Sequence, residues 1–307
     1  MTFPVITIKS YDKLEQLGTK SKFWFYDDSD NVIKLFKIGR PGTGENWSEK
    51  ASSELAKLLG LPCASYEFAV WEDAQGVVSP IFVPENGRLI HGNELLAKIV
   101  DHYPTTKSYK IREYKLTTVL ASLKALKNNV SLPIGYYGSD TIKNVSDLFV
   151  GYLMFDCWIS NPDRHHENWG LVFDGEQKSV HLAPTYDHAS GLGCRVSDEE
   201  CNKRLTTKDT RYSVSAFVAR TKSAFFGQGM KQLKIIGAFE VAAKFNKLAG
   251  NYWVEQLNNI ETENIVQIFH KIPNHLISKS SINFAVKMLH ENKNRLLETI
   301  GHINNDS

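Results

Sequence analysis

The sequence predicts an α+β protein whose first part is rich in strands and whose second part is rich in helices. Aromatic and β-branched runs separated by turn residues gather before about residue 90, whereas apolar residues at helical spacing dominate after it. The chain has 307 residues, 42% hydrophobic and 23% charged, which is an ordinary globular composition. This length predicts one two-lobed unit or about two domains, with enough apolar residues for a large core.

The first part is expected to fold as two strands, a helix and two more strands. Turn-forming residues 28–30 separate the first two runs, which predicts a hairpin. An apolar helical pattern extends from about residue 46 to 59, and Gly60 is placed to end the helix. The four strands are expected at 22–27, 31–38, 65–72 and 76–83.

Helical patterns dominate the second part. The pattern at 145–160 is apolar almost all round, which predicts a helix buried at the centre of this part. Helices are expected at about 112–127, 145–160, 233–247, 262–271 and 281–299.

Charge and composition narrow the classes of function. The formal net charge is +2 and the basic residues are scattered, so direct binding to nucleic acid is not expected. The first residues do not resemble a secretory signal, and Asp156 interrupts the most apolar run, so no membrane segment is expected. The four cysteines are too few for a disulfide scaffold. A reduced, cytoplasmic protein is expected.

The run NPDRHHENWGLVF at 161–173 concentrates polar chemistry directly after the central helix. A solvated turn, a metal site and a phosphoryl-transfer loop compete as interpretations. His165, His166 and Glu167 are adjacent, so they lack the i, i+4 histidine spacing of zinc proteases, and the cysteines lack paired spacing. A transition-metal site is therefore disfavoured.

The phosphoryl-transfer interpretation makes more demands, and the sequence meets them in order. Kinase catalytic loops place an asparagine five residues after the aspartate that accepts the substrate proton, as Asp163 and Asn168 are spaced. A strand at 170–173, a turn at 174–176 and a second strand ending at Asp187 follow. The Asn168 amide and the Asp187 carboxylate are oxygen ligands that suit Mg²⁺. A helix cap with two surface turns remains the structural alternative.

These segments carry a resemblance to a known family. The runs NPDRHHENWGLVF and LAPTYDHASGLG resemble the catalytic and metal-binding segments of the HipA-like serine/threonine kinases. The order Asp163, His165, Asn168 is closer to that family than to eukaryotic kinases. Upstream, 17–25 resembles the family's phosphate loop and 42–62 its N-lobe helix.

The resemblance implies a bilobal protein-kinase-like fold with ATP and Mg²⁺ as cofactors. Residues 1–85 would form a small β-rich N-lobe and 86–307 a larger, mainly helical C-lobe. Asp163 would be the catalytic base, and Asn168 and Asp187 would hold magnesium.

The resemblance also implies the nucleotide-binding residues. Lys37 is the preferred phosphate lysine, with Lys34 on the opposite strand face as the alternative. Glu49 is its expected ion-pair partner and Glu54 the second choice, although Asn46 and Glu49 also form a capping-box pattern. The expected phosphate loop is the run from Gly18 to Lys22. It is preferred over the glycine-rich run 39–45, because kinase phosphate loops precede the lysine strand. The other expected nucleotide-binding residues are Gly18, Thr19, Lys20, Ser21, Lys22, Phe82, Val83 and His165, with the adenine near 80–83.

The chain departs from the family in two ways. It resembles the shorter, HipT-like or free-standing members, because no extra N-terminal subdomain fits before Gly18. Glu15 stands near the place of the serine that family members autophosphorylate, with Thr19 or Ser21 as substitutes.

The family's partners give expectations of function. Relatives act on aminoacyl-tRNA synthetases and are often neutralised by a DNA-binding partner, so the resemblance implies a protein substrate and an antitoxin-like protein partner. A nucleotide-binding pseudokinase and a small-molecule or lipid kinase remain alternatives.

Residues 195–212 follow the metal-binding segment and have no sustained apolar period. This composition predicts a mobile stretch that substrate or phosphorylation orders. The expected phosphorylation sites are Thr206, Thr207 and Thr210, and their expected charge partners are Lys203, Arg204 and Arg211.

Overall fold

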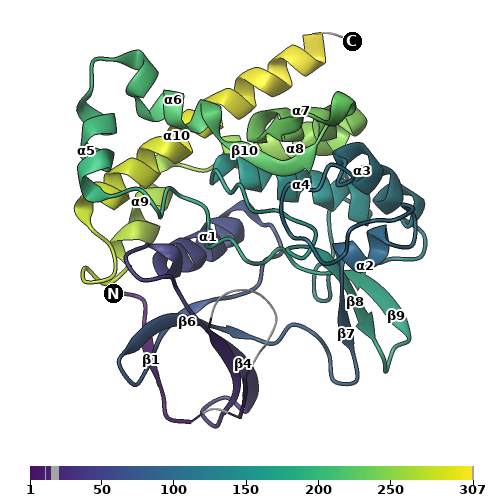
Figure 1. Cartoon of the computed structure of the whole chain (residues 1–307), viewed down its shortest axis with the longest axis horizontal. Helices are drawn as coiled ribbons and strands as arrows, with labels where there is room; N and C mark the ends of the chain where they lie inside the picture. Colours follow the sequence, from purple (N-terminus) through teal and green to yellow (C-terminus); the bar gives the residue numbers. More distant parts are fainter. Residues whose placement is uncertain (11, 15–20, 306–307) are drawn as a thin grey trace.

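The computed structural model describes residues 1–10, 12–14 and 21–305. It confirms the α+β class: Figure 1 shows a sheet from the first part of the chain on one side and a helical body on the other, with α1 (Glu45–Leu59) between them. Among the described helices, none is long and apolar enough to cross a membrane.

The first sheet has six strands in the order β1-β5-β6-β4-β3-β2. The expected hairpin is confirmed, since β3 and β4 pair antiparallel with Lys22 opposite Lys37. Apolar side chains that include Phe23 and Phe36 alternate into a small core on this sheet, as strand periodicity requires. The strands are β1 (Val5–Ile8), β2 (Lys13–Leu14), β3 (Lys22–Asp27), β4 (Val32–Ile38), β5 (Glu67–Trp71) and β6 (Ala74–Pro80).

Helix α1 ends as expected and begins differently. Gly60 adopts a left-handed conformation at φ 72°, the geometry that glycine allows at a helix C-terminus. The helix starts after Gly44 without a side-chain cap, so the capping box of Asn46 and Glu49 is wrong. Asn46 lies inside the first turn, and its side-chain amide donates to the Gln75 carbonyl at 3.2 Å. Glu49 lies about one helical turn further along α1 and is buried.

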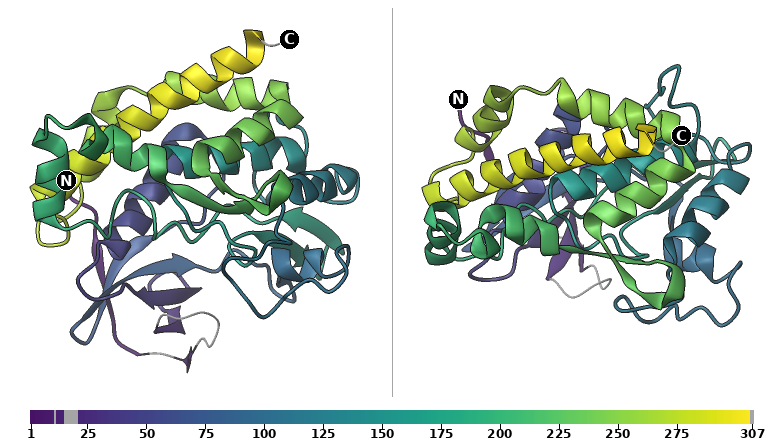
Figure 2. Two further views of the ribbon diagram at one scale, coloured as in Figure 1. Left: turned by 45° about the horizontal axis from the view of Figure 1, so that its top comes forward. Right: turned by 90° about the horizontal axis from the view of Figure 1, so that it is seen from above.

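The helical body is built around α4 (Val145–Trp158), every residue of which is buried. This confirms the predicted central helix. Its neighbours include α7, α8 and the long α10, which crosses the top of the molecule in the left view of Figure 2. The other helices are α2 (Gly92–Leu96), α3 (Leu116–Ala125), α5 (Asp198–Thr206), α6 (Val214–Arg220), α7 (Ile235–Phe245), α8 (Lys247–Asn258), α9 (Thr262–His270) and α10 (Lys279–Asn305).

A three-stranded antiparallel sheet includes the strand that directly follows the loop 161–168. Its strands are β7 (Arg88–His91), β8 (Gly170–Asp174) and β9 (Ser179–Leu182), in the order β7-β8-β9. The second strand was expected to reach Asp187 but ends at Leu182. The Ala183 N–H still donates to Gly170 of β8, but the Thr185 N–H donates to the Pro62 carbonyl, so the chain leaves the ladder before Asp187. A further hairpin joins β10 (Lys222–Phe226) and β11 (Gln232–Lys234).

The boundary between the expected lobes falls between elements. β6 ends at Pro80 and β7 begins at Arg88, so residue 85 lies in the connecting segment. Helix α1 nevertheless packs into the main core of the helical body, with the Trp47 ring 6.5 Å from that of Phe269. The division into 1–85 and 86–307 stays a prediction.

Residues 195–212, which are predicted to be mobile, include regular structure, and their mobility stays a prediction. They contain α5 and a short 3-10 helix at Thr210–Tyr212. The Ser197 hydroxyl caps α5, whose first turn is acidic and last turn basic, as the helix dipole favours. Cys201 packs against α6 and α10, so neighbouring helices supply the apolar partners that the segment itself lacks.

Candidate active site

The loop after α4 is fixed by a buried ion pair between Asp156 and Arg164. The guanidinium donates twice to the carboxylate, from Nε to Oδ2 and from Nη2 to Oδ1, each at 2.8 Å. Arg164 Nη1 also donates to the carbonyls of Asn168 at 2.7 Å and Tyr186 at 3.4 Å. One buried side chain thus holds the loop 161–168 beside the segment that carries Asp187.

His188 completes this buried network. Its Nε2 lies 2.9 Å from Arg164 Nη2 and 2.8 Å from the Thr185 hydroxyl. A guanidinium only donates, so Nε2 must accept and the ring must be neutral. Burial and the Arg164 charge hold the pKa of His188 well below its usual range, in agreement with this protonation state.

Asp163 lies at the front of the loop with its carboxylate 22% exposed. The Ser190 hydroxyl donates to its Oδ2 at 3.2 Å, and His165 Nε2 lies 3.9 Å from its Oδ1. Burial raises the pKa of Asp163, and the nearby Asp187 carboxylate adds to the rise, while His165 opposes it. Burial and the Asp163 carboxylate together raise the pKa of Tyr109 to about 12.

Asn168 and Asp187 present oxygen atoms from the two neighbouring segments. The Asn168 amide nitrogen donates to the Asp163 carbonyl at 2.6 Å, which commits the nitrogen and leaves the amide oxygen as the ligand atom. Asp187 has φ 59°, a left-handed conformation uncommon for a residue with a side chain. Such backbone strain concentrates at functional sites.

The structure brings Lys37, Glu49 and Asp187 together. Lys37 Nζ lies 3.3 Å from Asp187 Oδ1 and 4.0 Å from Glu49 Oε2, and 5.5 Å from the centre of the Tyr66 ring. Burial alone would lower the pKa of Lys37, but Asp187, Tyr66 and Glu49 raise it well above its usual range. Glu49 Oε1 also accepts the backbone N–H of His188 at 2.7 Å, which ties α1 to the Asp187 segment.

The two alternatives from the sequence lie elsewhere. Lys34 Nζ pairs with Asp27 at 2.7 Å and Asp30 at 2.6 Å in the β3–β4 hairpin, on the face opposite Lys37. Glu54 pairs with Lys50 and Lys57 along α1. Neither Lys34 nor Glu54 joins the cluster around Asp187.

Only Ser21 and Lys22 of the expected phosphate loop belong to the described residues. Gly18, Thr19 and Lys20 lie outside them. The Ser21 carbonyl accepts the N–H of Ile38 at 3.1 Å, and Lys22 lies directly across the ladder from Lys37, on the same face of the sheet.

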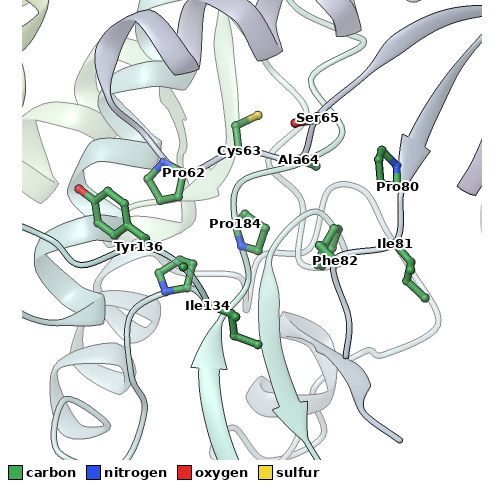
Figure 3. A pocket seen from close by; sticks show the side chains of 12 residues that line it. Pro62, Cys63, Ala64, Ser65, Pro80, Ile81, Phe82, Ile134, Tyr136 and Pro184 are labelled. Carbon is green, nitrogen blue, oxygen red and sulfur yellow. The ribbon is translucent and has the colours of Figure 1, made fainter. Parts of the chain in front are cut away.

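The expected adenine segment lies beside a hollow of about 360 Å³ (Figure 3). Phe82 lines it and packs on Tyr186 with ring centres 5.6 Å apart, while Val83 contacts the main core. The rest of the lining comes from 62–65, 133–136 and Pro184, so this hollow does not include Asp163, Asp187 or Lys37. Cys63 is half-buried there, and desolvation of its thiol raises the pKa of this group.

Sequence reasoning missed several residues of this site. Arg164 stands between Asp163 and His165. Its signal was Asp156, a carboxylate in the apolar run 148–158 that requires a cationic partner when buried. No local sequence signal indicated Tyr66, Tyr109, Ser190 or Arg195, which reach the site only through the fold.

No protein-family model matches the chain. The "Putative kinase Y4dM" of Sinorhizobium fredii is 24% identical over 161 residues, which span 52% of this chain and 37% of that protein. The chain therefore aligns with well under two-thirds of this relative's length.

Two solved structures share the fold. The proinflammatory kinase CtkA of Helicobacter pylori superposes with a TM-score of 0.72 at 18% identity, covering 97% of each chain. HipA of Shewanella oneidensis MR-1, in a complex with HipB and operator DNA, superposes with a TM-score of 0.59 at 12% identity, covering 99% of this chain and 69% of HipA. The chain has a kinase fold. Within that class, it has the fold of the HipA-like kinases.

Proposed function

We propose that the chain is an ATP- and Mg²⁺-dependent serine/threonine protein kinase of the HipA type. The observation that carries the proposal is the meeting of Lys37, Glu49 and Asp187, with Nζ to carboxylate distances of 3.3 and 4.0 Å, next to the loop of Asp163 and Asn168. This is the set of groups that kinases use to hold a nucleotide and position a hydroxyl.

The proposed nucleotide-binding part of the site uses Lys37 and Glu49, whose charged groups are already paired in the fold. Lys37 would bind the phosphates, and Glu49 would keep its ammonium in place. The donor set fits magnesium, because the Asp187 carboxylate and the Asn168 amide oxygen are hard oxygen ligands on adjoining segments. A bound Mg²⁺ would neutralise charge on the phosphate oxygens. Ser21 and Lys22 are proposed to extend the phosphate contacts, and Phe82, Val83 and His165 to bind other parts of the nucleotide.

Asp163 is proposed to act on the hydroxyl group that accepts the phosphate. Its carboxylate would take the proton of the attacking serine or threonine hydroxyl, as a general base must lie within hydrogen-bond reach of that proton. The bond from Ser190 at 3.2 Å shows that a hydroxyl can reach this carboxylate. The raised pKa of Asp163 makes it a stronger proton acceptor than an ordinary aspartate.

The substrate and partner are proposed from the family likeness. HipA was solved with HipB and operator DNA, which supports an antitoxin-like protein partner for this chain. An aminoacyl-tRNA synthetase is the first substrate to test. Labelled phosphate from ATP should appear on serine or threonine of a purified synthetase panel or of lysate proteins, and label on small molecules or lipids alone would contradict a protein kinase.

We expect MgATP to stabilise the fold. At a hundred times its dissociation constant, a ligand that binds only the folded state adds about 2.7 kcal/mol to the free energy of unfolding. Thermal melts with ATP, with MgATP and with MgATP plus chelator measure this effect, and chelation should remove most of it. An unchanged melting midpoint across millimolar MgATP would contradict nucleotide binding.

A further inference from the structure

A second charged cluster lies one helical turn from Glu49 on α1. Glu45 has 1% of its side chain exposed, and its Oε1 accepts from Arg40 Nη1 at 2.6 Å and from Arg195 Nη2 at 3.0 Å. Arg40 comes from the loop between β4 and α1, and Arg195 from the segment after Asp187. Two distant parts of the chain thus place guanidinium groups on one buried carboxylate.

This cluster reaches the proposed base through one hydroxyl. Arg195 Nη2 donates to Ser190 Oγ at 3.1 Å, and Ser190 Oγ donates to Asp163 Oδ2 at 3.2 Å. Arg40 lies within electrostatic range of Asp163 and Tyr109. Tyr109 is 59% exposed and interacts electrostatically with both Arg40 and Asp163.

The two guanidinium groups of the cluster are accessible. Both contact the buried Glu45 carboxylate, while the Arg40 and Arg195 side chains are 43% and 51% exposed. The buried Glu45 fixes the inner edge of both groups, so less rotamer freedom is lost when a ligand binds. Planar guanidinium groups match carboxylate and phosphate oxygens, which makes them suited to reading an anionic side chain.

We propose that Arg40 and Arg195 form a specificity site that selects acceptor hydroxyls flanked by an anionic side chain. This inference rests on the proposed kinase function and adds the substrate class. An extended peptide advances about 3.3 Å per residue. A side chain one or two residues from the acceptor therefore reaches a guanidinium that lies two hydrogen bonds from Asp163.

Peptide binding tests the site without requiring turnover. Fluorescence anisotropy would compare peptides with one acceptor serine whose flanking residues are all Glu, all Gln or all Lys, with Mg²⁺ and a non-hydrolysable ATP analogue present. We expect the Glu peptide to bind about tenfold more tightly than the Gln peptide, and the Lys peptide more weakly than both. A fourth peptide with flanking phosphoserines distinguishes phosphate from carboxylate as the preferred anion.

Single variants locate the preference on the protein. Arg40→Ala and Arg195→Ala should each reduce the preference for Glu over Gln to about threefold or less, and Arg195→Lys should retain part of it. Each single variant leaves one arginine on Glu45, whereas a double variant would remove both guanidinium groups from this buried carboxylate. Arg88→Ala is the matched control, because Arg88 forms an exposed pair with Glu94 and should keep the full preference.

Two outcomes overturn the inference. Equal binding of the Glu and Gln peptides, including no binding of either, removes the specificity site even if MgATP still raises the melting midpoint. A Glu preference that survives both alanine variants places the anion elsewhere. Loss of the MgATP effect in the wild-type protein contradicts the proposed function itself, so the two failures are distinguishable.

Discussion

Replacing Asp163 by asparagine should lower phosphoryl transfer by about 10²- to 10⁴-fold, the range expected for loss of a general base. The affinity for MgATP should change by less than about threefold, because the proposed phosphate lysine, Lys37, pairs with Asp187, whereas the Asp163 carboxylate accepts from Ser190. Single-turnover transfer and nucleotide titration measure the two effects separately. The asparagine keeps the size of the side chain and its bond from Ser190, so the fold should be unchanged.

Asp187→Asn should behave differently. Asp187 pairs with Lys37 and supplies a proposed magnesium ligand, so this variant should weaken Mg²⁺-dependent nucleotide binding as well as transfer. Asp140→Asn is the control, since Asp140 is exposed and outside the site, and it should match the wild type in both assays. Equal loss of nucleotide affinity in the Asp163 and Asp187 variants would show that these two roles are assigned wrongly.

Local patterns were sufficient for much of the fold. The β3–β4 hairpin, α1 with its glycine stop, and the buried α4 each depend on periodicity and turn residues within one short stretch. Helix α8 was missed although its buried residues Ala249, Trp253 and Leu257 recur at helical spacing. Asn246 ends α7 and caps α8, so two adjacent helices read as one pattern with an uncertain end.

The residues of the candidate site could be predicted only in part from local sequence patterns. The spacing of Asp163, Asn168 and Asp187 is local enough to be recognised, and Lys37 could be preferred over Lys34 only by resemblance. The structure separates these lysines by their partners, Asp187 for one and the hairpin aspartates for the other. Arg195 joins Glu45 across 150 residues of sequence, and no periodic pattern encodes such a contact.

The helical structure of residues 198–206 also depends on contacts between residues that are distant in the sequence. Their own composition is too polar to form a core, but Cys201 finds Val218 and Met288 from α6 and α10. Tertiary packing therefore decides the structure of a stretch whose local sequence favours disorder.

Arg164→Met should destabilise the fold by about 3–5 kcal/mol, the cost of leaving a buried carboxylate without its partner. Asp156 and Arg164 expose only 4% and 2% of their side chains, so water cannot replace the lost bonds. Urea unfolding at 25 °C measures the change as a shift in midpoint. Arg88→Ala removes an arginine whose side chain is 60% exposed in its ion pair with Glu94, and should change stability by no more than about 0.5 kcal/mol.

A double variant separates the ion pair from the other bonds of Arg164. Asp156→Leu combined with Arg164→Met removes both buried charges, and such replacements often restore stability. Here the Asn168 and Tyr186 carbonyls would still lose their donor, so the double variant should remain about 1–3 kcal/mol less stable than the wild type. Full recovery in the double variant would mean that Arg164 serves only Asp156. Incomplete recovery, with weakened MgATP binding, is expected because the same guanidinium holds the Asn168 loop beside the Asp187 segment.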